Sequence, residues 1–268
     1  MNSKFLKILS VLTVTVVILA GCGREQSKDD SLKKIRGKGY FIVGLDDTFP
    51  PMGFRSEDNN EIVGFDVDLA KEAARRMGIN VQFKPVVWDG VIMSLDRGDI
   101  DVIWNGLTIT EEREKKINFS RPYLNNRQII MVRFESPVNK LSDLKGKVIG
   151  LQRGSSSEKA LGSNDSFAKS IKEVKKYENN NLALMDLAAK RVDAVVIDEI
   201  VGRWSMAMKP GKYKIIDDDL GKELYGVGIR KTDITFKEEL DRVLEKIKND
   251  STGEEISKKS FGTNILLK

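Results

Sequence analysis

The sequence predicts an α/β protein of two lobes, each a mainly parallel sheet flanked by helices. Short apolar runs alternate with amphipathic helical segments along most of the 268 residues, which is typical of parallel strands joined by helices. One helix-to-strand junction occurs twice: Leu95–Gly98 leads into Ile100–Val102, and Leu187–Lys190 leads into Val192–Ala194. Two copies, in a chain longer than one average domain, favour two similar lobes over a solenoid.

The first half of the chain shows the alternation most clearly. Short apolar runs predict strands at Tyr40–Leu45, Val81–Phe83 and Ile100–Trp104. Helical spacing of apolar residues, followed each time by glycine, predicts helices at Asp66–Met77 and Asp89–Arg97. The segment Thr48–Phe54 is expected to be a loop, because two adjacent prolines exclude a helix interior and a central strand.

The second half repeats the alternation. Strands or strand-like segments are expected at Lys147–Leu151, Val192–Ile197 and Tyr225–Ile229, and helices at Ser157–Leu161, Asn181–Lys190 and Phe236–Lys248. A chain that forms one lobe, crosses to the other and returns has its hinges near Tyr123–Ile130 and Glu223–Gly228. We therefore assign 31–124 and 226–268 to lobe 1 and 125–225 to lobe 2. Two connecting strands leave a cleft that can close on a small ligand.

The N-terminal residues indicate where the protein works. Lys4 and Lys7 precede an apolar run, Ile8–Ala20, which is shorter than the roughly 20 residues of a membrane span and has the size of a signal-peptide core. The sequence Leu19–Cys22 resembles a lipoprotein processing site. It predicts a signal peptide over 1–21, acyl chains on Cys22, and a polar, flexible tether over 22–30.

The composition excludes several classes of function. The chain has no histidine and one cysteine, so histidine bases, Ser-His or Cys-His nucleophiles and histidine metal ligands are ruled out. No metal or cofactor is expected. The formal charge of +5 falls to +3 when the lysines of the signal peptide are removed. Basic and acidic residues are interspersed, so nucleic acid is not an expected partner.

Polar residues follow four of the predicted strands. In open α/β sheets ligands bind beyond the carboxyl ends of the strands. These ends carry Asp46, Asn105–Thr108, Arg153–Ser157 and Asp198. The set suits a zwitterion. The start of the helix at Gly154–Ser157 offers N–H donors and a positive dipole to a carboxylate, and Arg113 offers a two-pronged cation.

The ammonium group of a zwitterion needs acceptors at tetrahedral spacing. The Gly106 carbonyl, the Thr108 hydroxyl and the Asp198 carboxylate can supply them. Taken singly, each signal has an ordinary structural explanation. A glycine-serine turn or an aspartate after a strand is commonly a helix cap, and an arginine such as Arg113 is commonly part of a surface ion pair. The prediction rests on their joint placement at the strand ends.

Two motifs resemble a known family. Gly64–Leu69 followed by Ala73 and Ala74, and Asn105–Arg113 followed by Ile117–Ser120, are similar to signatures of the polar amino acid family (family 3) of extracytoplasmic solute-binding proteins. The similarity runs from Tyr40 to Gly262. It implies a periplasmic-binding-protein-like type II fold with two hinge strands, serving an ABC importer as its substrate-binding lipoprotein. The implied partners are an amino acid, a permease and the membrane, and we expect a monomer that is not an enzyme.

The resemblance also implies roles for individual residues. The ligand carboxylate is assigned to Arg113, Thr108, Ser155 and Ser156, and the ammonium group to Gly106, Thr108 and Asp198. The ligand side chain is assigned to Asp46, Phe49, Trp88 and Gln152. Asp66 and Asp68 belong to the first motif but open a helix, so we interpret them as capping and structural.

The identity of the ligand leaves alternatives open. Polar Asp46 and Gln152 beside flat Phe49 and Trp88 favour a polar uncharged side chain, such as that of glutamine or cystine. A basic amino acid, with Asp46 as counter-ion, is the second choice. Two other classes are a dehydratase on the same fold, acting on prephenate-like acids, and a sensing or adhesive surface protein without a transporter.

Overall fold

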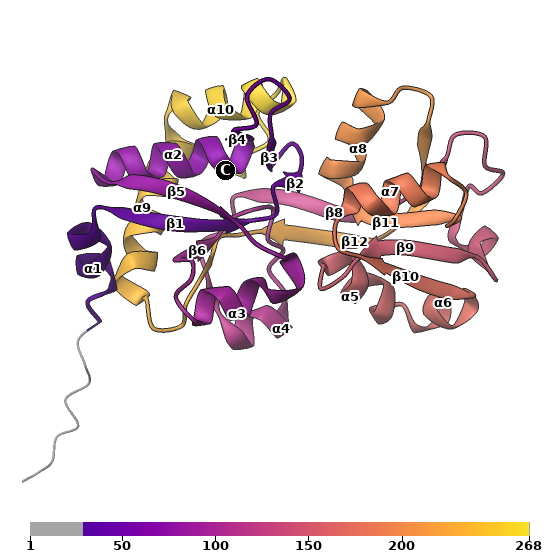
Figure 1. Ribbon diagram of the computed structural model, residues 1–268, viewed down its shortest axis with the longest axis horizontal. Coiled ribbons are helices and arrows are strands. Elements are labelled where there is room, and N and C mark those ends of the chain that lie inside the picture. Colours follow the sequence, from indigo (N-terminus) through magenta and orange to yellow (C-terminus); the bar gives the residue numbers. More distant parts are fainter. Residues whose placement is uncertain (1–28, 268) are drawn as a thin grey trace, which may run out of the picture.

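Two five-stranded sheets, which lie side by side, organise the protein (Figure 1). The computed structural model describes residues 29–267. The expected signal peptide, most of the tether and Cys22 lie outside the described residues. No helix within 29–267 is both long and apolar enough to cross a bilayer.

Lobe 1 is built on the sheet with strand order β5-β1-β6-β13-β7. Strands β5, β1 and β6 are parallel, and β13 pairs antiparallel with β6 and β7. The strands are β1 (Tyr40–Leu45), β5 (Asn80–Pro85), β6 (Val102–Ile103), β7 (Asn118–Phe119) and β13 (Gly228–Ile229). The helices are α1 (Ser31–Lys38), α2 (Phe65–Met77), the 3₁₀ turn η1 (Trp88–Gly90), α3 (Val91–Asp96), α4 (Glu111–Lys116), α9 (Ile234–Asn249) and α10 (Ser251–Phe261).

Lobe 2 has the strand order β10-β9-β11-β8-β12. Here β10, β9 and β11 are parallel, and β8 pairs antiparallel with β11 and β12. The strands are β8 (Leu124–Arg133), β9 (Val148–Gln152), β10 (Glu173–Tyr177), β11 (Ala194–Asp198) and β12 (Tyr213–Tyr225). The helices are the 3₁₀ turn η2 (Leu141–Leu144), α5 (Ser156–Ser163), α6 (Asp165–Ser170), α7 (Asn180–Ala188) and α8 (Glu199–Met208).

The chain crosses between the lobes on β8 and β12, which run together through the middle of the molecule (Figure 1). They pair antiparallel from Leu124 opposite Tyr225 to Arg133 opposite Tyr213. Near the C-terminus Leu266 bridges to Leu124, and the Leu267 N–H donates to the Tyr123 carbonyl at 2.9 Å. The C-terminal segment therefore lies against the start of the crossover.

The apolar pattern of helix α2 determines how the helix packs. Its apolar residues at helical spacing are all buried, with Val67, Ala70 and Ala74 on one stripe and Leu69, Ala73 and Met77 on another. The small alanines allow α2 to lie close to β1, β5 and α9 at once. Gly78, in the left-handed conformation, ends the helix by donating to the Ala74 and Arg75 carbonyls.

One predicted element is wrong. The segment Thr48–Phe54 is not a plain loop, because β2 (Thr48–Phe49) and β3 (Gly53–Arg55) form a hairpin that continues to β4 (Ile62–Val63). Pro50 and Pro51 lie in the turn between the strands. The prolines therefore remove no hydrogen bond from the pairing, and the rule that excludes proline from central strands does not apply.

A substitution at Gly64 tests the connection between β4 and α2. Its φ of 138° and ψ of 176° lie in a region that only glycine adopts readily. An added Cβ would also overlap the Met52 carbonyl and lie 2.8 Å from the Pro51 oxygen. Gly64→Ala should lower the free energy of unfolding by roughly 1–3 kcal/mol, measured by urea denaturation. Gly37→Ala, which meets nothing within 4 Å in helix α1, is the control and should not destabilise.

Candidate functional site

The two lobes meet through hydrogen bonds between predicted site residues. The Arg113 guanidinium donates to the Thr108 carbonyl of its own lobe at 2.9 Å and to the Gly154 carbonyl of lobe 2 at 3.2 Å. The Thr108 and Ser156 hydroxyls are 3.0 Å apart across the same junction. Residues from two sheets are thus brought into one small volume, and the lobes are closed on each other.

Arg113 is positioned by the start of helix α4. Thr110 caps that helix, and its hydroxyl accepts from the Arg113 N–H at 3.2 Å. The guanidinium carbon lies 6.0 Å from the centre of the Trp88 ring. Desolvation lowers the pKa of Arg113, and the charges of Glu223 and Asp198 oppose that shift. The cation therefore depends on acids beyond its own helix.

Asp198 ends β11 and is the most buried of the predicted ligand acids, with 3 % of its surface exposed. Its Oδ1 accepts from Tyr225 Oη at 2.7 Å, Asn126 Nδ2 at 2.6 Å and Gln128 Nε2 at 3.0 Å. Burial and the nearby charge of Glu223 raise the pKa of Asp198 to about 7. Neutral donors therefore hold the Asp198 carboxyl, which can accept a cation.

The structure adds three polar residues that sequence reasoning missed. Glu223 Oε2 accepts from Thr108 Oγ1 at 2.9 Å, Gln128 Nε2 at 2.9 Å and Asn126 Nδ2 at 3.1 Å. The sequence pattern places Glu223, Asn126 and Gln128 only at a hinge. Their spacing was a usable signal: Asn126 and Gln128, like Glu223 and Tyr225, are two apart and so face the same side of their strands.

Gly106 forms a sharp turn after β6. Its φ of 57° is left-handed, and an added Cβ would lie 2.9 Å from Phe49 Cε1 and 3.0 Å from Tyr225 Cε2. Only glycine fits between these rings. The Gly106 N–H donates to Asp66 Oδ2 at 2.7 Å, which fixes the turn that carries the Gly106 carbonyl.

The capping role expected for Asp66 and Asp68 is wrong, although both are structural. The N-cap of α2 is Gly64, and no side chain caps it. Asp66 is fully buried and accepts from Gly106 and from Tyr123 Oη at 3.0 Å, and burial raises its pKa to about 7. Asp68 forms an ion pair with Lys259 at 2.6 Å.

Asp46 and Gln152 form another contact between the lobes. Gln152 Nε2 donates to Asp46 Oδ2 at 2.8 Å, and the Thr48 backbone N–H and hydroxyl donate to Asp46 Oδ1 at 2.9 and 2.6 Å. Burial raises the pKa of Asp46. Phe49 and Trp88 are also buried. The side-chain group expected from sequence therefore spans both lobes.

Ser155 and Trp104 take local roles. Ser155 caps helix α5: its hydroxyl donates to the Gln152 carbonyl at 2.6 Å and accepts from the Glu158 N–H at 3.3 Å. Trp104 is buried in the core against Tyr123, with ring centres 6.4 Å apart. The Ser155 hydroxyl is thus engaged in holding the start of helix α5.

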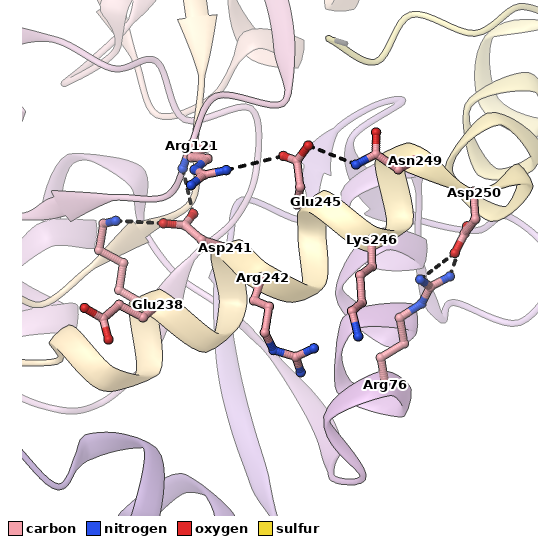
Figure 2. A pocket seen from close by; sticks show the side chains of 10 residues that line it. Arg76, Arg121, Glu238, Asp241, Arg242, Glu245, Lys246, Asn249 and Asp250 are labelled. Atoms are coloured by element: carbon pink, nitrogen blue, oxygen red, sulfur yellow. Dashed lines mark hydrogen bonds and ion pairs between the residues drawn. The ribbon is translucent and has the colours of Figure 1, made fainter.

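A hollow of about 480 Å³ lies at the mouth of the junction and is lined from both lobes, including Asp89, Arg113, Ser155, Ser156 and Lys159. A larger hollow of about 840 Å³ lies on α9, away from the junction (Figure 2). Charged side chains that line this larger hollow form ion pairs with one another; Arg76 and Asp250, for example, are 2.7 Å apart. Of the predicted ligand residues, Arg113, Ser155 and Ser156 line the smaller hollow. Within 29–267 no cluster of three or more histidine, cysteine or acidic side chains could hold a metal.

The fold and these contacts define a class: a two-lobed periplasmic-binding-protein-like type II fold, with opposed charged and polar groups where its lobes meet. Residues 41–263 match the family described as bacterial extracellular solute-binding proteins, family 3. The chain belongs to that family.

Individual relatives are similar along most of their length. The L-cystine-binding protein TcyJ of Escherichia coli (strain K12) is 28 % identical over 255 residues, which is 94 % of each chain. A substrate-binding protein of an ABC uptake transporter from Streptococcus pneumoniae, solved with bound histidine, is 32 % identical, with a TM-score of 0.87 over 90 % of this chain and all of its own. An ancestral arginine-binding protein bound to arginine is 41 % identical, with a TM-score of 0.76 over 84 % of this chain and 99 % of its own.

The buried Asp66 predicts a pH-dependent contribution to stability. A pKa of about 7 in the folded protein, against an ordinary value near 4, means that this carboxyl favours folding below about pH 4 and loses that contribution as pH rises through 7. Relative to Asp66→Asn, the wild type should therefore gain up to roughly 4 kcal/mol of unfolding free energy between pH 8 and pH 4.

Urea denaturation at several pH values measures this difference. Asp68→Asn is the control, since its carboxylate forms a surface ion pair. An unfolding free-energy difference between wild type and Asp66→Asn that stays constant with pH would contradict the assignment.

Proposed function

We propose that this protein is the lipid-anchored substrate-binding component of an amino acid ABC importer, and that it captures a free basic L-amino acid by closing its lobes. The observation that carries the proposal is the charge of the predicted site residues where the lobes meet: Arg113 lies near the acids Asp198 and Glu223, and a third acid, Asp46, bonds to Gln152 across the lobes. A zwitterion has no net charge, and the cleft has more negative than positive groups.

The carboxylate end of the ligand is assigned to Arg113, Thr108 and Ser156. Ser156 begins helix α5, so its N–H group lies at the positive end of the helix dipole, where anions bind. Arg113 reaches from lobe 1 to lobe 2, so a carboxylate bound there touches both lobes. Such a ligand stabilises the closed form through contacts that exist only when the lobes meet.

The ammonium end is assigned to Asp198, the Gly106 carbonyl and the Thr108 hydroxyl. Gly106 and Thr108 belong to lobe 1 and Asp198 to lobe 2, and Tyr225 links them by bridging to Thr108 and donating to Asp198. An ammonium group between these acceptors is paired with a buried acid, which is the condition for burying charge at acceptable cost.

The side-chain end is assigned to Asp46, Gln152, Phe49 and Trp88. With the ligand carboxylate on Arg113 and its ammonium group on Asp198, a neutral side chain would leave the buried Asp46 without a cation. A guanidinium or ammonium group supplies one. For this reason the basic amino acid, the second choice from sequence, is preferred here to glutamine or cystine.

The remaining parts of the proposal concern location and partners. The sequence Leu19–Cys22 supports a lipid anchor at Cys22 on the outer face of the cell membrane, in the periplasm where an outer membrane exists. The closed lobes present the ligand to the permease of the importer. The protein acts as a monomer and by binding alone, without catalysis.

Calorimetry with arginine, lysine, histidine, glutamine and cystine tests the ligand class. Arginine or another basic amino acid should bind most tightly, because it alone neutralises Asp46. Asp46→Asn should weaken arginine at least tenfold, about 1.4 kcal/mol, and change glutamine little. Asp47→Asn is the matched control: Asp47 is the adjacent acid and is paired with Arg55 at 2.6 Å.

Two results would count against the proposal. If the wild type bound glutamine or cystine most tightly and Asp46→Asn left the affinity for arginine unchanged, the proposal of a basic ligand would be contradicted. If none of the five amino acids bound, the proposal that the protein captures an amino acid would be contradicted.

A further inference from the structure

Two carboxylates lie side by side at the crossover strands. Asp198 Oδ1 and Glu223 Oε2 accept from the same two amide groups: Asn126 Nδ2, at 2.6 and 3.1 Å, and Gln128 Nε2, at 3.0 and 2.9 Å. Oxygens that share a donor in this way are no more than about 6 Å apart. The two acids therefore form a close pair.

The orientation of Gln128 is set from outside the pair. The Ser157 hydroxyl donates to Gln128 Oε1 at 2.6 Å, which turns the Nε2 group toward the carboxylates and the Ser156 hydroxyl. Asn126 and Gln128 are neutral. They satisfy the carboxylate oxygens and supply no charge, so the repulsion between the two acids is not cancelled by their hydrogen-bond donors.

The charged groups around the pair come from four elements. Arg113, on α4, is the cation that acts on both acids, and its guanidinium donates to two backbone carbonyls. Tyr225 donates its hydroxyl to Asp198. Glu199, on α8, forms an ion pair with Arg127 of β8 at 2.7 Å. The charges of these two residues therefore offset each other and do not act on Asp198 and Glu223. Within 29–267, neither Asp198 nor Glu223 has a lysine or arginine nitrogen within 4.0 Å.

Two close acids, of which Asp198 is buried and Glu223 is partly buried, resist ionising together. Burial and the charge of Glu223 raise the pKa of Asp198 to about 7, in keeping with this geometry. Near neutral pH the pair therefore carries one negative charge and one proton for much of the time.

We propose that the pair of Asp198 and Glu223 holds one proton in the free protein and releases it to solvent when the ammonium group of the ligand takes its place. Glu223 becomes a second acceptor for that ammonium group. The inference rests on the proposed function, because it needs an amino acid in the cleft. It adds a residue to the ammonium subsite and makes capture of the ligand proton-linked.

The direction of the pH effect follows from the exchange. A ligand that displaces a proton binds more weakly as the solution becomes more acidic, since protons compete for the pair. For one group titrating near pH 7, the Kd should be about tenfold higher at pH 6 than at pH 8. Arginine and glutamine suit the test, because neither side chain titrates in this range, whereas the imidazole of histidine does.

Calorimetry at pH 7 in phosphate and in Tris counts the released protons, because the two buffers differ in ionisation enthalpy. Arginine, or glutamine if it binds better, should release about half a proton per site. Glu223→Gln removes the second acid while keeping a side chain of the same shape, so proton release should fall and the Kd should vary less between pH 6 and 8, with burial alone still raising the pKa of Asp198. Asp217→Asn changes an exposed acid on the same strand and should behave as wild type.

Measurements on the wild type are enough to test the proton exchange. Amino acid binding with heats independent of the buffer and a Kd independent of pH would overturn the proton exchange and leave the proposed function intact. Retention of full proton release by Glu223→Gln would overturn the role of Glu223. Absence of binding by any amino acid at either pH would overturn the proposed function, and this inference with it.

Discussion

The guanidinium of Arg113 is the interaction on which the rest of the cleft depends. It joins the Thr108 carbonyl of one lobe to the Gly154 carbonyl of the other, in a site where desolvation disfavours its charge. A cation removed from water needs anions close by, or it costs several kcal/mol. Asp198 and Glu223 supply negative potential from lobe 2 and the crossover, and the carboxylate of a ligand would supply the direct partner.

The crossover strands do more than connect the lobes. The side of β8 that carries Asn126 and Gln128, and the side of β12 that carries Glu223 and Tyr225, face Asp198 and Thr108. The predicted hinge and the proposed ammonium subsite thus involve the same strands. A change of protonation or of ligand at the acids acts directly on the strands about which the lobes would move, without any intervening element.

Sequence patterns predicted the parts of the molecule that are set locally. The apolar runs of β1 and β9 and the helical spacing of α2 reflect burial of one face, and the assigned residues followed strand ends because parallel sheets gather those ends. What was missed depends on long-range pairing. Glu223 meets Asn126 only through the register of β8 and β12, and Asp66 meets Gly106 across 40 residues. No local signal distinguishes Asp66 from a helix cap.

The most direct test of the account is the affinity of the Arg113→Ala protein for its amino acid, measured by calorimetry. Lys116→Ala, on the same helix, removes a cation that is paired with Glu112 at the surface and is the matched control. The account predicts a loss of about 2–5 kcal/mol for Arg113→Ala, at least thirtyfold in Kd, and little change for Lys116→Ala. Binding by Arg113→Ala as tight as that of the wild type would contradict it.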